Sequence, residues 1–381
     1  MNFSSRLPHE IHPNALSLLV DEKRRAGVPI LDLTESNPTR AGIVYPEGFL
    51  TALSDSRAAV YEPEPFGLPA ARELIGREYG VPADRVVMTA STSEAYSWLF
   101  KLLCDPGDEV LVPRPSYPLF DYLAALESVT VRHYGLFYDH GSWCIDFHTI
   151  ERELNDRTRA IVVVNPNNPT GHFIARHEST ELTALCASRG LAIISDEVFR
   201  DYAIAPRAES ALTLGGAENG LTFTLHGLSK AVGLPQMKLA WMIASGADDL
   251  VRQAMQRLEM IADTYLSAGT PVQCALPALL ALRKPVQSQV MGRLRENLAF
   301  LRASGLRTLE VEAGWYAIVS QGARAGDDFA ERLLRVRDVL VQPGYFYDFE
   351  SGGHFVLSLL TRPEIFRRGV ERLVEAVAGH D

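Results

Sequence analysis

The sequence predicts an α/β protein with a mainly parallel β-sheet covered by helices on both faces, together with a smaller α+β domain. Six runs of the chain are almost continuously apolar and end in turn residues, which is typical of strands buried on both faces of a parallel sheet. They lie at 84–89, 108–113, 159–165, 191–195, 221–225 and 239–244. Helical patterns at 93–103 and 177–190 lie between such runs, and this alternation indicates a doubly wound sheet.

The character of the chain changes after about residue 265. Long helical stretches follow, and then isolated strands at 314–320 and 354–360. A chain of 381 residues also favours two domains over one. We therefore predict a large α/β domain over 46–265 and a small α+β domain formed by 1–45 and 266–381.

The composition argues against several kinds of partner. The formal net charge is −10 and no run rich in lysine or arginine occurs, whereas a nucleic-acid surface needs clustered cations. The four cysteines form no CxxC pair, so we expect free thiols and neither a zinc site nor a disulfide framework. No apolar run is long enough to cross a bilayer, and the N-terminus lacks the apolar centre of a signal peptide. We expect a cytoplasmic protein without metal, nucleic-acid or membrane partners.

The polar residues at the ends of the predicted strands are the first candidates for a site, because open parallel sheets bind ligands beyond the carboxyl ends of their strands. Ser91, Thr92 and Ser93 follow the strand at 84–89 and begin a helix, with Glu94 in the register of a capping box. Free backbone N–H groups, hydroxyl donors and the positive end of a helix suit a phosphate. An ordinary helix cap is the alternative interpretation.

Three further strands end in single candidate residues. Tyr117 lies in a turn with two prolines, where its ring forms one wall of a flat pocket or simply packs in the turn. Asn168 lies in a turn rich in proline and asparagine, and either presents its amide to a ligand or closes the turn. Asp196 follows a buried strand, where a carboxylate caps a helix or pairs with a buried cation, since burying it alone is costly.

Two of the five lysines of the chain lie close together, between the apolar runs 221–225 and 239–244. Lys230 follows the first run, and burial there would lower its pKa and make it a nucleophile able to form a Schiff base with a carbonyl cofactor. Lys238 precedes the second run and would complete an anion site. Taken alone, either lysine is better explained as a surface residue. The whole set fits one ligand, an aromatic aldehyde with a phosphate, a hydroxyl and a ring nitrogen.

At this point the sequence resembles the fold-type I, aspartate-aminotransferase-like family of pyridoxal-phosphate enzymes, the class I and II aminotransferases. The resemblance runs from about residue 30 almost to the C-terminus and depends on an ordered set of strings rather than on one motif. They lie at 61–75, 89–95, 106–120 ("PGDEVLVPRPSYPLF"), 165–171 ("NPNNPTG"), 195–199 ("SDEVF"), 226–235 ("HGLSKAVGLP") and 314–316. The resemblance implies the family fold and pyridoxal 5′-phosphate as the cofactor.

The resemblance also implies roles for single residues. Lys230 corresponds to the Schiff-base lysine, which later moves a proton, and Asp196 to the partner of the pyridine nitrogen. Tyr117 corresponds to the residue that stacks on the ring, and Asn168 to the donor to its phenolic oxygen. The catalytic residues implied are thus Lys230, Asp196 and Tyr117. Those implied for the phosphate are Ser91, Thr92, Ser93, Ser229 and Lys238.

One further residue implies an assembly. Tyr61 resembles the tyrosine that reaches the cofactor phosphate of the neighbouring subunit. A homodimer with shared active sites is therefore expected. The residues expected to contact the substrate are Asn37, Arg40, Asn168 and Tyr316.

The chain departs from the family pattern at three positions. Lys238 stands where many relatives have arginine, which keeps the charge but loses the bidentate fork. Phe199 stands where a tyrosine would assist Asn168, so we predict a raised pKa for the Schiff base of Lys230. Val356 stands where an arginine usually holds the substrate α-carboxylate. Arg40 is the candidate replacement, with a solvated loop arginine as the equal alternative.

The leading functional prediction is transamination between an amino acid and a 2-oxo acid by a ping-pong mechanism, with an atypical carboxylate site. A lyase, racemase or decarboxylase on the same scaffold is the alternative, because a fold does not determine a reaction. A non-catalytic regulator that binds a ligand through this domain ranks last. The aromatic residues at 345–349, with Trp315 and Tyr316, hint only weakly at an aromatic or apolar substrate pocket.

Overall fold

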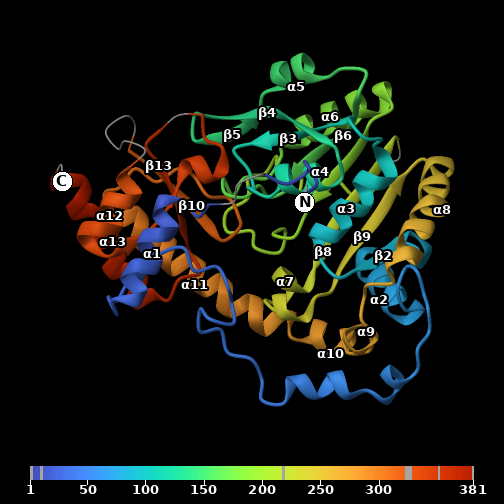
Figure 1. The fold of residues 1–381 in the computed structure, drawn as a ribbon, viewed down its shortest axis with the longest axis horizontal. Helices are drawn as coiled ribbons and strands as arrows, with labels where there is room; N and C mark the ends of the chain where they lie inside the picture. The colour runs from blue at the N-terminus through green and yellow to red at the C-terminus, as the bar shows by residue number, and fades with distance from the viewer. Residues whose placement is uncertain (1–2, 9–11, 217–218, 322–327, 351, 380–381) are drawn as a thin grey trace.

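The central feature of the computed structural model is an eight-stranded sheet in the order β2-β9-β8-β7-β6-β3-β4-β5 (Figure 1). The structure describes residues 3–8, 12–216, 219–321, 328–350 and 352–379. In sheet order the strands are β2 (Val86–Thr89), β9 (Ala240–Gly246), β8 (Leu221–Gly227), β7 (Ala192–Asp196), β6 (Thr158–Val164), β3 (Glu109–Arg114), β4 (Thr130–Asp139) and β5 (Ser142–Ile145).

The pairing of the strands is parallel except at β9 and β5. Strand β9 is antiparallel to both β8 and β2, and β5 is antiparallel to β4. All six strands predicted from apolar runs are present. The mainly parallel α/β fold predicted from the sequence is confirmed.

The two faces of the sheet bury alternate residues of the same strands. Ile161 and Val163 of β6 belong to one hydrophobic cluster, whereas Val162 and Val164 belong to another. Because both faces are buried, the strand reads as a continuous apolar run, and period-two alternation is lost. The helices around the sheet are α2 (Pro69–Tyr79), α3 (Thr92–Leu103), α4 (Phe120–Leu126), α5 (Phe147–Glu153), α6 (Arg176–Arg189), α7 (Leu228–Ala231) and α8 (Asp248–Tyr265).

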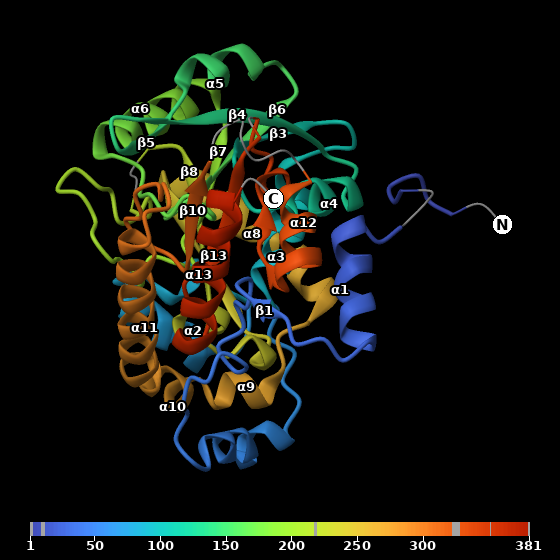
Figure 2. The ribbon, with the colours of Figure 1, turned by 90° about the vertical axis from the view of Figure 1, so that its left-hand side faces the viewer.

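A smaller antiparallel sheet lies beside the large one, in the order β10-β13-β12 (Figure 2). Its strands are β10 (Tyr316–Ser320), β13 (His354–Ser358) and β12 (Gln342–Pro343). The helices of this part are α1 (Ala15–Arg25), α11 (Arg283–Ala303), α12 (Phe329–Arg337) and α13 (Pro363–Gly379). Two short helices, α9 (Thr270–Cys274) and α10 (Leu276–Ala281), pack against residues 49–59, and α10 also contacts α2. This smaller part matches the predicted α+β class.

The N-terminal segment joins the C-terminal part through a short parallel pair. Strand β1 (Leu31–Asp32) pairs with β11 (Val339–Leu340), so segments from opposite ends of the chain lie side by side. The boundaries of the two domains, at residues 45 and 265, stay a prediction. Short 3₁₀ helices lie at η1 (Phe49–Ser54), η2 (Ser56–Ala59), η3 (Ala83–Arg85), η4 (Pro235–Met237) and η6 (Gly344–Tyr347).

In the part of the chain that the structure describes, no helix combines the length and apolar character needed to cross a membrane. The four cysteines, Cys104, Cys144, Cys186 and Cys274, are free thiols.

The reversed direction of β9 matters for the site. Because β9 runs against β8, its first residues lie at the edge of the sheet where β8, β7 and β6 end. The turn 228–239 therefore both leaves and re-enters the sheet at this edge. Lys230 lies near the start of this turn and Lys238 near its end, so both lysines lie at the same edge of the sheet.

Candidate active site

The carboxyl edge of the large sheet carries a cavity of about 310 Å³ that brings together most of the predicted site residues. Those that line it are Ser91, Thr92, Ser93, Tyr117, Asn168, Asp196, Ser229, Lys230, Lys238 and Tyr316. Tyr61, Asn37 and Arg40 do not line it. The cavity lies between strand ends of the large sheet and the first residue of β10, so both parts of the chain contribute to it.

Lys230 lies in the one-turn helix α7, which begins directly after β8. Its Nζ lies 5.1 Å from the centre of the Phe199 ring and 4.9 Å from that of Trp315. Burial lowers the pKa of Lys230 to about 8, although the charge of Asp196 acts in the opposite direction. The backbone carbonyl of Lys230 accepts a hydrogen bond of 2.6 Å from the Tyr202 hydroxyl. The backbone of Lys230 is therefore fixed by a hydrogen bond, and the lowered pKa increases the neutral fraction of the amine, as a nucleophile requires.

Asp196 is the last residue of β7. Its Oδ2 accepts a hydrogen bond of 3.2 Å from the Tyr96 hydroxyl, and its Oδ1 accepts one of 3.2 Å from the backbone N–H of Val198. Burial nevertheless raises the pKa of Asp196 to about 6. A buried carboxylate with a raised pKa is suited to a cationic partner, because that partner would favour the charged form.

The first turn of α3 also lines the cavity. Ser91 is the N-cap: its hydroxyl accepts from the backbone N–H of Glu94, whose carboxylate accepts from the backbone N–H of Ala90. Thr92 and Ser93 begin the helix, where backbone N–H groups lack partners within the helix. Ser91 therefore caps the helix, while Glu94 reaches the N–H of Ala90 instead of the Ser91 N–H that a capping box uses. The segment also lines the cavity, and its role as an anion site stays a prediction.

Lys238 occupies an unusual backbone conformation. It ends η4 with a left-handed φ of 49° directly before β9 begins. Ser229 and the N-terminal turn of α3 line the same cavity, so hydroxyl and N–H donors are present there together with this cation. That chemistry suits a phosphate.

Asn168 and Tyr117 contribute an amide and an aromatic ring. Asn168 is buried, and its Oδ1 has no hydrogen-bond partner among the described residues. Its neighbour Asn167 is structural, since Asn167 Oδ1 accepts from the Thr170 hydroxyl at 2.9 Å. The ring of Tyr117 is 41% exposed and meets Phe120 edge-on at 6.3 Å.

The sequence interpretation missed two residues of the cavity. Tyr96, which hydrogen-bonds to Asp196, lies one helical turn after Thr92, and that spacing could have indicated it. Ser36 reaches the cavity from the N-terminal segment and hydrogen-bonds with Tyr316. No local signal distinguishes Ser36 from other loop serines.

Two predicted substrate residues point elsewhere. Arg40 has a side chain that is 76% exposed, and its Nε lies 3.8 Å from Glu35. Asn37 uses its Oδ1 to accept from the backbone N–H and the hydroxyl of Thr39, at 3.1 and 2.8 Å. The alternative interpretation of Arg40, a solvated loop arginine, therefore describes the structure better. Asn37 closes a local turn.

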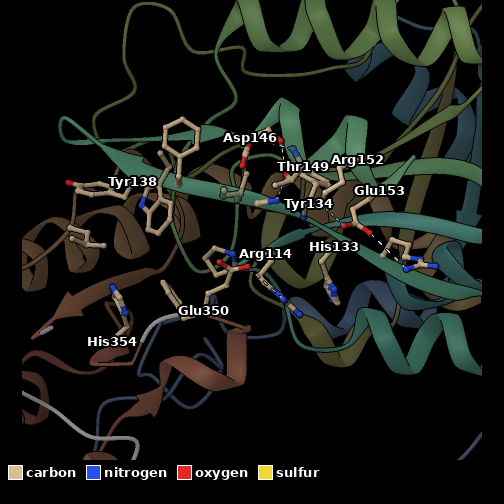
Figure 3. A pocket seen from close by; sticks show the side chains of 18 of the residues that line it. Arg114, His133, Tyr134, Tyr138, Asp146, Thr149, Arg152, Glu153, Glu350 and His354 are labelled. Carbon is tan, nitrogen blue, oxygen red and sulfur yellow. Dashed lines mark hydrogen bonds and ion pairs between the residues drawn. The ribbon is translucent and has the colours of Figure 1, made fainter. Parts of the chain in front are cut away.

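A larger cavity, of about 650 Å³, lies elsewhere, along β4 (Figure 3). Among its charged residues, Arg152 pairs with Glu153 at 3.0 Å, and Arg114 lies 3.9 Å from Glu350. It contains no lysine beside a buried carboxylate. Size therefore does not identify the active site, and the chemistry of the smaller cavity does.

Comparison with known proteins points to one family. The family model described as aminotransferase class I and II matches residues 32–373. A glutamate-pyruvate aminotransferase of Haemophilus influenzae is 27% identical over 97% of this chain and 95% of its own, and an alanine aminotransferase of Mycobacterium tuberculosis is 26% identical over 95% and 88%.

Two solved structures share the fold. An alanine aminotransferase from Pyrococcus furiosus matches with a TM-score of 0.85 at 25% identity, covering 96% of each chain. An aminotransferase from Escherichia coli has a TM-score of 0.87 at 23% identity, covering 100% of this chain and 98% of its own.

Proposed function

The chain belongs to the class I and II aminotransferase family, and from the geometry of its site we propose how its residues carry out pyridoxal-phosphate-dependent transamination. The chain is thus an enzyme that moves an amino group between an amino acid and a 2-oxo acid. The relatives do not favour the lyase, racemase or decarboxylase alternative. The roles of single residues that follow are our proposals.

One observation carries the proposal: a lysine with a lowered pKa and a carboxylate with a raised pKa share one cavity. We assign Lys230 to the aldehyde carbon of the cofactor and Asp196 to its pyridine nitrogen. When bound, the cofactor supplies an electron sink for the bonds of the substrate α-carbon. Lys230 then holds and returns the α-proton, since its amine titrates near neutral pH.

The other residues of the cavity fit the same cofactor. The start of α3, Ser229 and Lys238 offer N–H, hydroxyl and ammonium donors to its phosphate. We assign the Nδ2 group of Asn168 as the donor to its phenolic oxygen, and Tyr117 to one face of its ring. The donors, the lysine and the carboxylate that line the cavity therefore match the phosphate, the aldehyde and the ring nitrogen of the cofactor. Ping-pong kinetics follow, because the amino group stays on the cofactor between the two half-reactions.

We propose a homodimer with shared sites. The segment 44–61 exposes several large apolar side chains, among them Val44 (71% exposed), Val60 (59%) and Tyr61 (74%). Clustered exposed apolar residues mark interaction surfaces. A second copy of the chain would cover this segment and bring Tyr61 to the neighbouring phosphate site. The cytoplasmic location and the absence of nucleic-acid and membrane partners stay predictions from composition.

The relatives named as glutamate-pyruvate and alanine aminotransferases supply the first substrates to test. We expect the holoenzyme to convert L-alanine and 2-oxoglutarate to pyruvate and L-glutamate. Pyruvate is measured with a coupled dehydrogenase assay. The Lys230→Ala variant should lose this activity and the absorbance of bound cofactor, whereas full activity in that variant would contradict the assignment of Lys230.

A further inference from the structure

We propose that this site also accepts primary amines whose α-carboxyl group is replaced by a neutral group, such as amino-acid amides and amino alcohols. The inference rests on the proposed function, because it concerns the substrate end of the same cavity. It is an activity beyond the exchange of free amino acids and 2-oxo acids, and it follows from the charges around the cavity.

The described residues that line the cavity include only three charged side chains, Asp196, Lys230 and Lys238. All three are assigned to the cofactor. The residues left for the substrate are neutral, among them Ser36, Asn168, Phe199 and Tyr316. A carboxylate bound among them loses water without gaining a cation, and this makes its binding costly.

Three arginines contact the N-terminal segment that contributes Ser36, and none of them lines the cavity. Arg40 faces Glu35 and solvent. Arg362 donates to the backbone carbonyl of Arg40 at 3.3 Å. Arg293 donates to the carbonyls of Ala41 and Leu360, at 3.0 and 3.2 Å. These contacts attach the turn at residues 40–43 to the segment that follows β13. The arginines stabilise the fold here and leave no guanidinium in the cavity.

Val356 occupies the position where the resemblance to the family places an arginine. It lies in the middle of β13, with Ile318 of β10 and Gln342 of β12 as its partners in the sheet. It is fully buried. An apolar side chain therefore fills the position from which an arginine would extend toward the substrate.

The unpartnered Oδ1 of Asn168 points to the kind of group that fits instead. This oxygen is buried and accepts no hydrogen bond from any described residue. A carboxylate carries only acceptors and cannot satisfy it, whereas an amide N–H or an alcohol O–H donates. A substrate with a neutral donor beside its α-carbon therefore complements the cavity better than a carboxylate does.

The proposed reaction is the amino-donor half-reaction of transamination, with a neutral group in place of the α-carboxylate. With L-alaninamide, the amino group passes from the α-carbon to the cofactor, and the α-hydrogen leaves as a proton that Lys230 moves to the cofactor carbon. Water supplies the oxygen of the new ketone, giving the 2-oxo amide. The substrate is oxidised by two electrons and the cofactor is reduced by two, so no further reactant is needed.

The test uses the holoenzyme in single turnovers without an acceptor. Loss of the bound-cofactor absorbance is followed by stopped flow with L-alanine, L-alaninamide and L-alaninol. We expect at least one neutral analogue to react within about tenfold of L-alanine, because no charge-assisted hydrogen bond to a carboxylate is lost. A preference for L-alanine of more than tenfold over both analogues overturns the inference, including the case in which a second copy of the chain supplies a cation. If no amino acid or analogue reacts, the proposed function fails, which is a different result.

A substitution at position 356 tests whether Val356 determines the preference between charged and neutral substrates. Val356→Arg should raise the preference for L-alanine over L-alaninamide by about tenfold or more, since a guanidinium binds a carboxylate by charge-assisted hydrogen bonds. Val356→Met is the control of similar reach without charge and should leave the ratio unchanged. A folded Val356→Arg protein with an unchanged ratio contradicts the role given to this position. If that variant does not fold, the three-substrate comparison in the unaltered enzyme decides.

Discussion

At the scale of single residues, Lys230 controls how the protein captures its cofactor. Burial lowers the pKa of its amine to about 8, and only the neutral amine attacks an aldehyde. Below this pKa the neutral fraction falls tenfold per pH unit. We expect the rate of cofactor capture by the cofactor-free protein to rise with pH and to level off above about pH 8. Stopped-flow absorbance between pH 6 and pH 10 measures it, and a rise that continues to pH 10 would indicate an ordinary lysine.

Phe199 offers a second test at the residue scale. Its ring meets Trp315 edge-on at 5.3 Å and lies beneath the Lys230 amine. Phe199→Tyr would add a phenol beside the cofactor oxygen, and one hydrogen bond contributes about 1 kcal/mol, or roughly 0.7 pH units. We expect the midpoint of the cofactor's absorbance titration to fall by about this amount. An identical midpoint in the variant would contradict the effect.

For Arg40, in contrast to Lys230 and Phe199, we expect a substitution to have almost no effect. Because its side chain is exposed and faces Glu35, we expect Arg40→Ala to leave KM for L-alanine within about twofold, as is usual for surface substitutions. Steady-state kinetics measure this. A rise of tenfold or more in KM would show that Arg40 reaches the substrate during turnover.

At the scale of elements, the hydrogen bonds at the N-terminus of α3 connect helix stability with cofactor binding. Glu94 accepts from Ala90 N–H and from the Ser267 hydroxyl, at 2.7 and 2.6 Å. We expect Glu94→Ala to lower the free energy of unfolding by about 1–2 kcal/mol and to weaken cofactor affinity. Urea denaturation and cofactor titration measure the two effects. Glu73→Ala is the control, since Glu73 lies in α2 and makes only an exposed pair with Arg77.

The strands also show which parts of the fold can be predicted from the sequence alone. The six strands of the sheet centre could be predicted because burial on both faces makes them continuously apolar. Strands β4 and β5 were missed, since β4 alternates between buried and partly exposed residues and has no apolar run. The antiparallel direction of β9 could not be predicted, because the apolar pattern of a strand is the same whether it pairs parallel or antiparallel with its neighbours. Lys238 was nevertheless placed correctly at the cavity, from its position directly before that strand.

At the scale of the whole molecule, the exposed segment 44–61 predicts the assembly. We expect Val60→Asp to shift the protein from dimer to monomer, since it would bury a charge in an apolar contact. Analytical ultracentrifugation measures the shift. Leu18→Asp is the matched control, because Leu18 is similarly exposed, at 52%, but lies in α1. A monomeric unaltered protein, or a dimer that survives Val60→Asp, would contradict the proposed surface.

The parallel pair of β1 with β11 has a consequence for how the protein is made. Leu31 pairs with Val339, so a segment synthesised among the first must wait for one synthesised near the end. Before β1 pairs with β11, Ser36, which is only a few residues from β1, is not held in position. The cavity then lacks one of its lining segments. A nascent chain on the ribosome can complete most of the large sheet, but it cannot enclose a substrate. Catalytic competence therefore arises only after both β1 and β11 have left the exit tunnel.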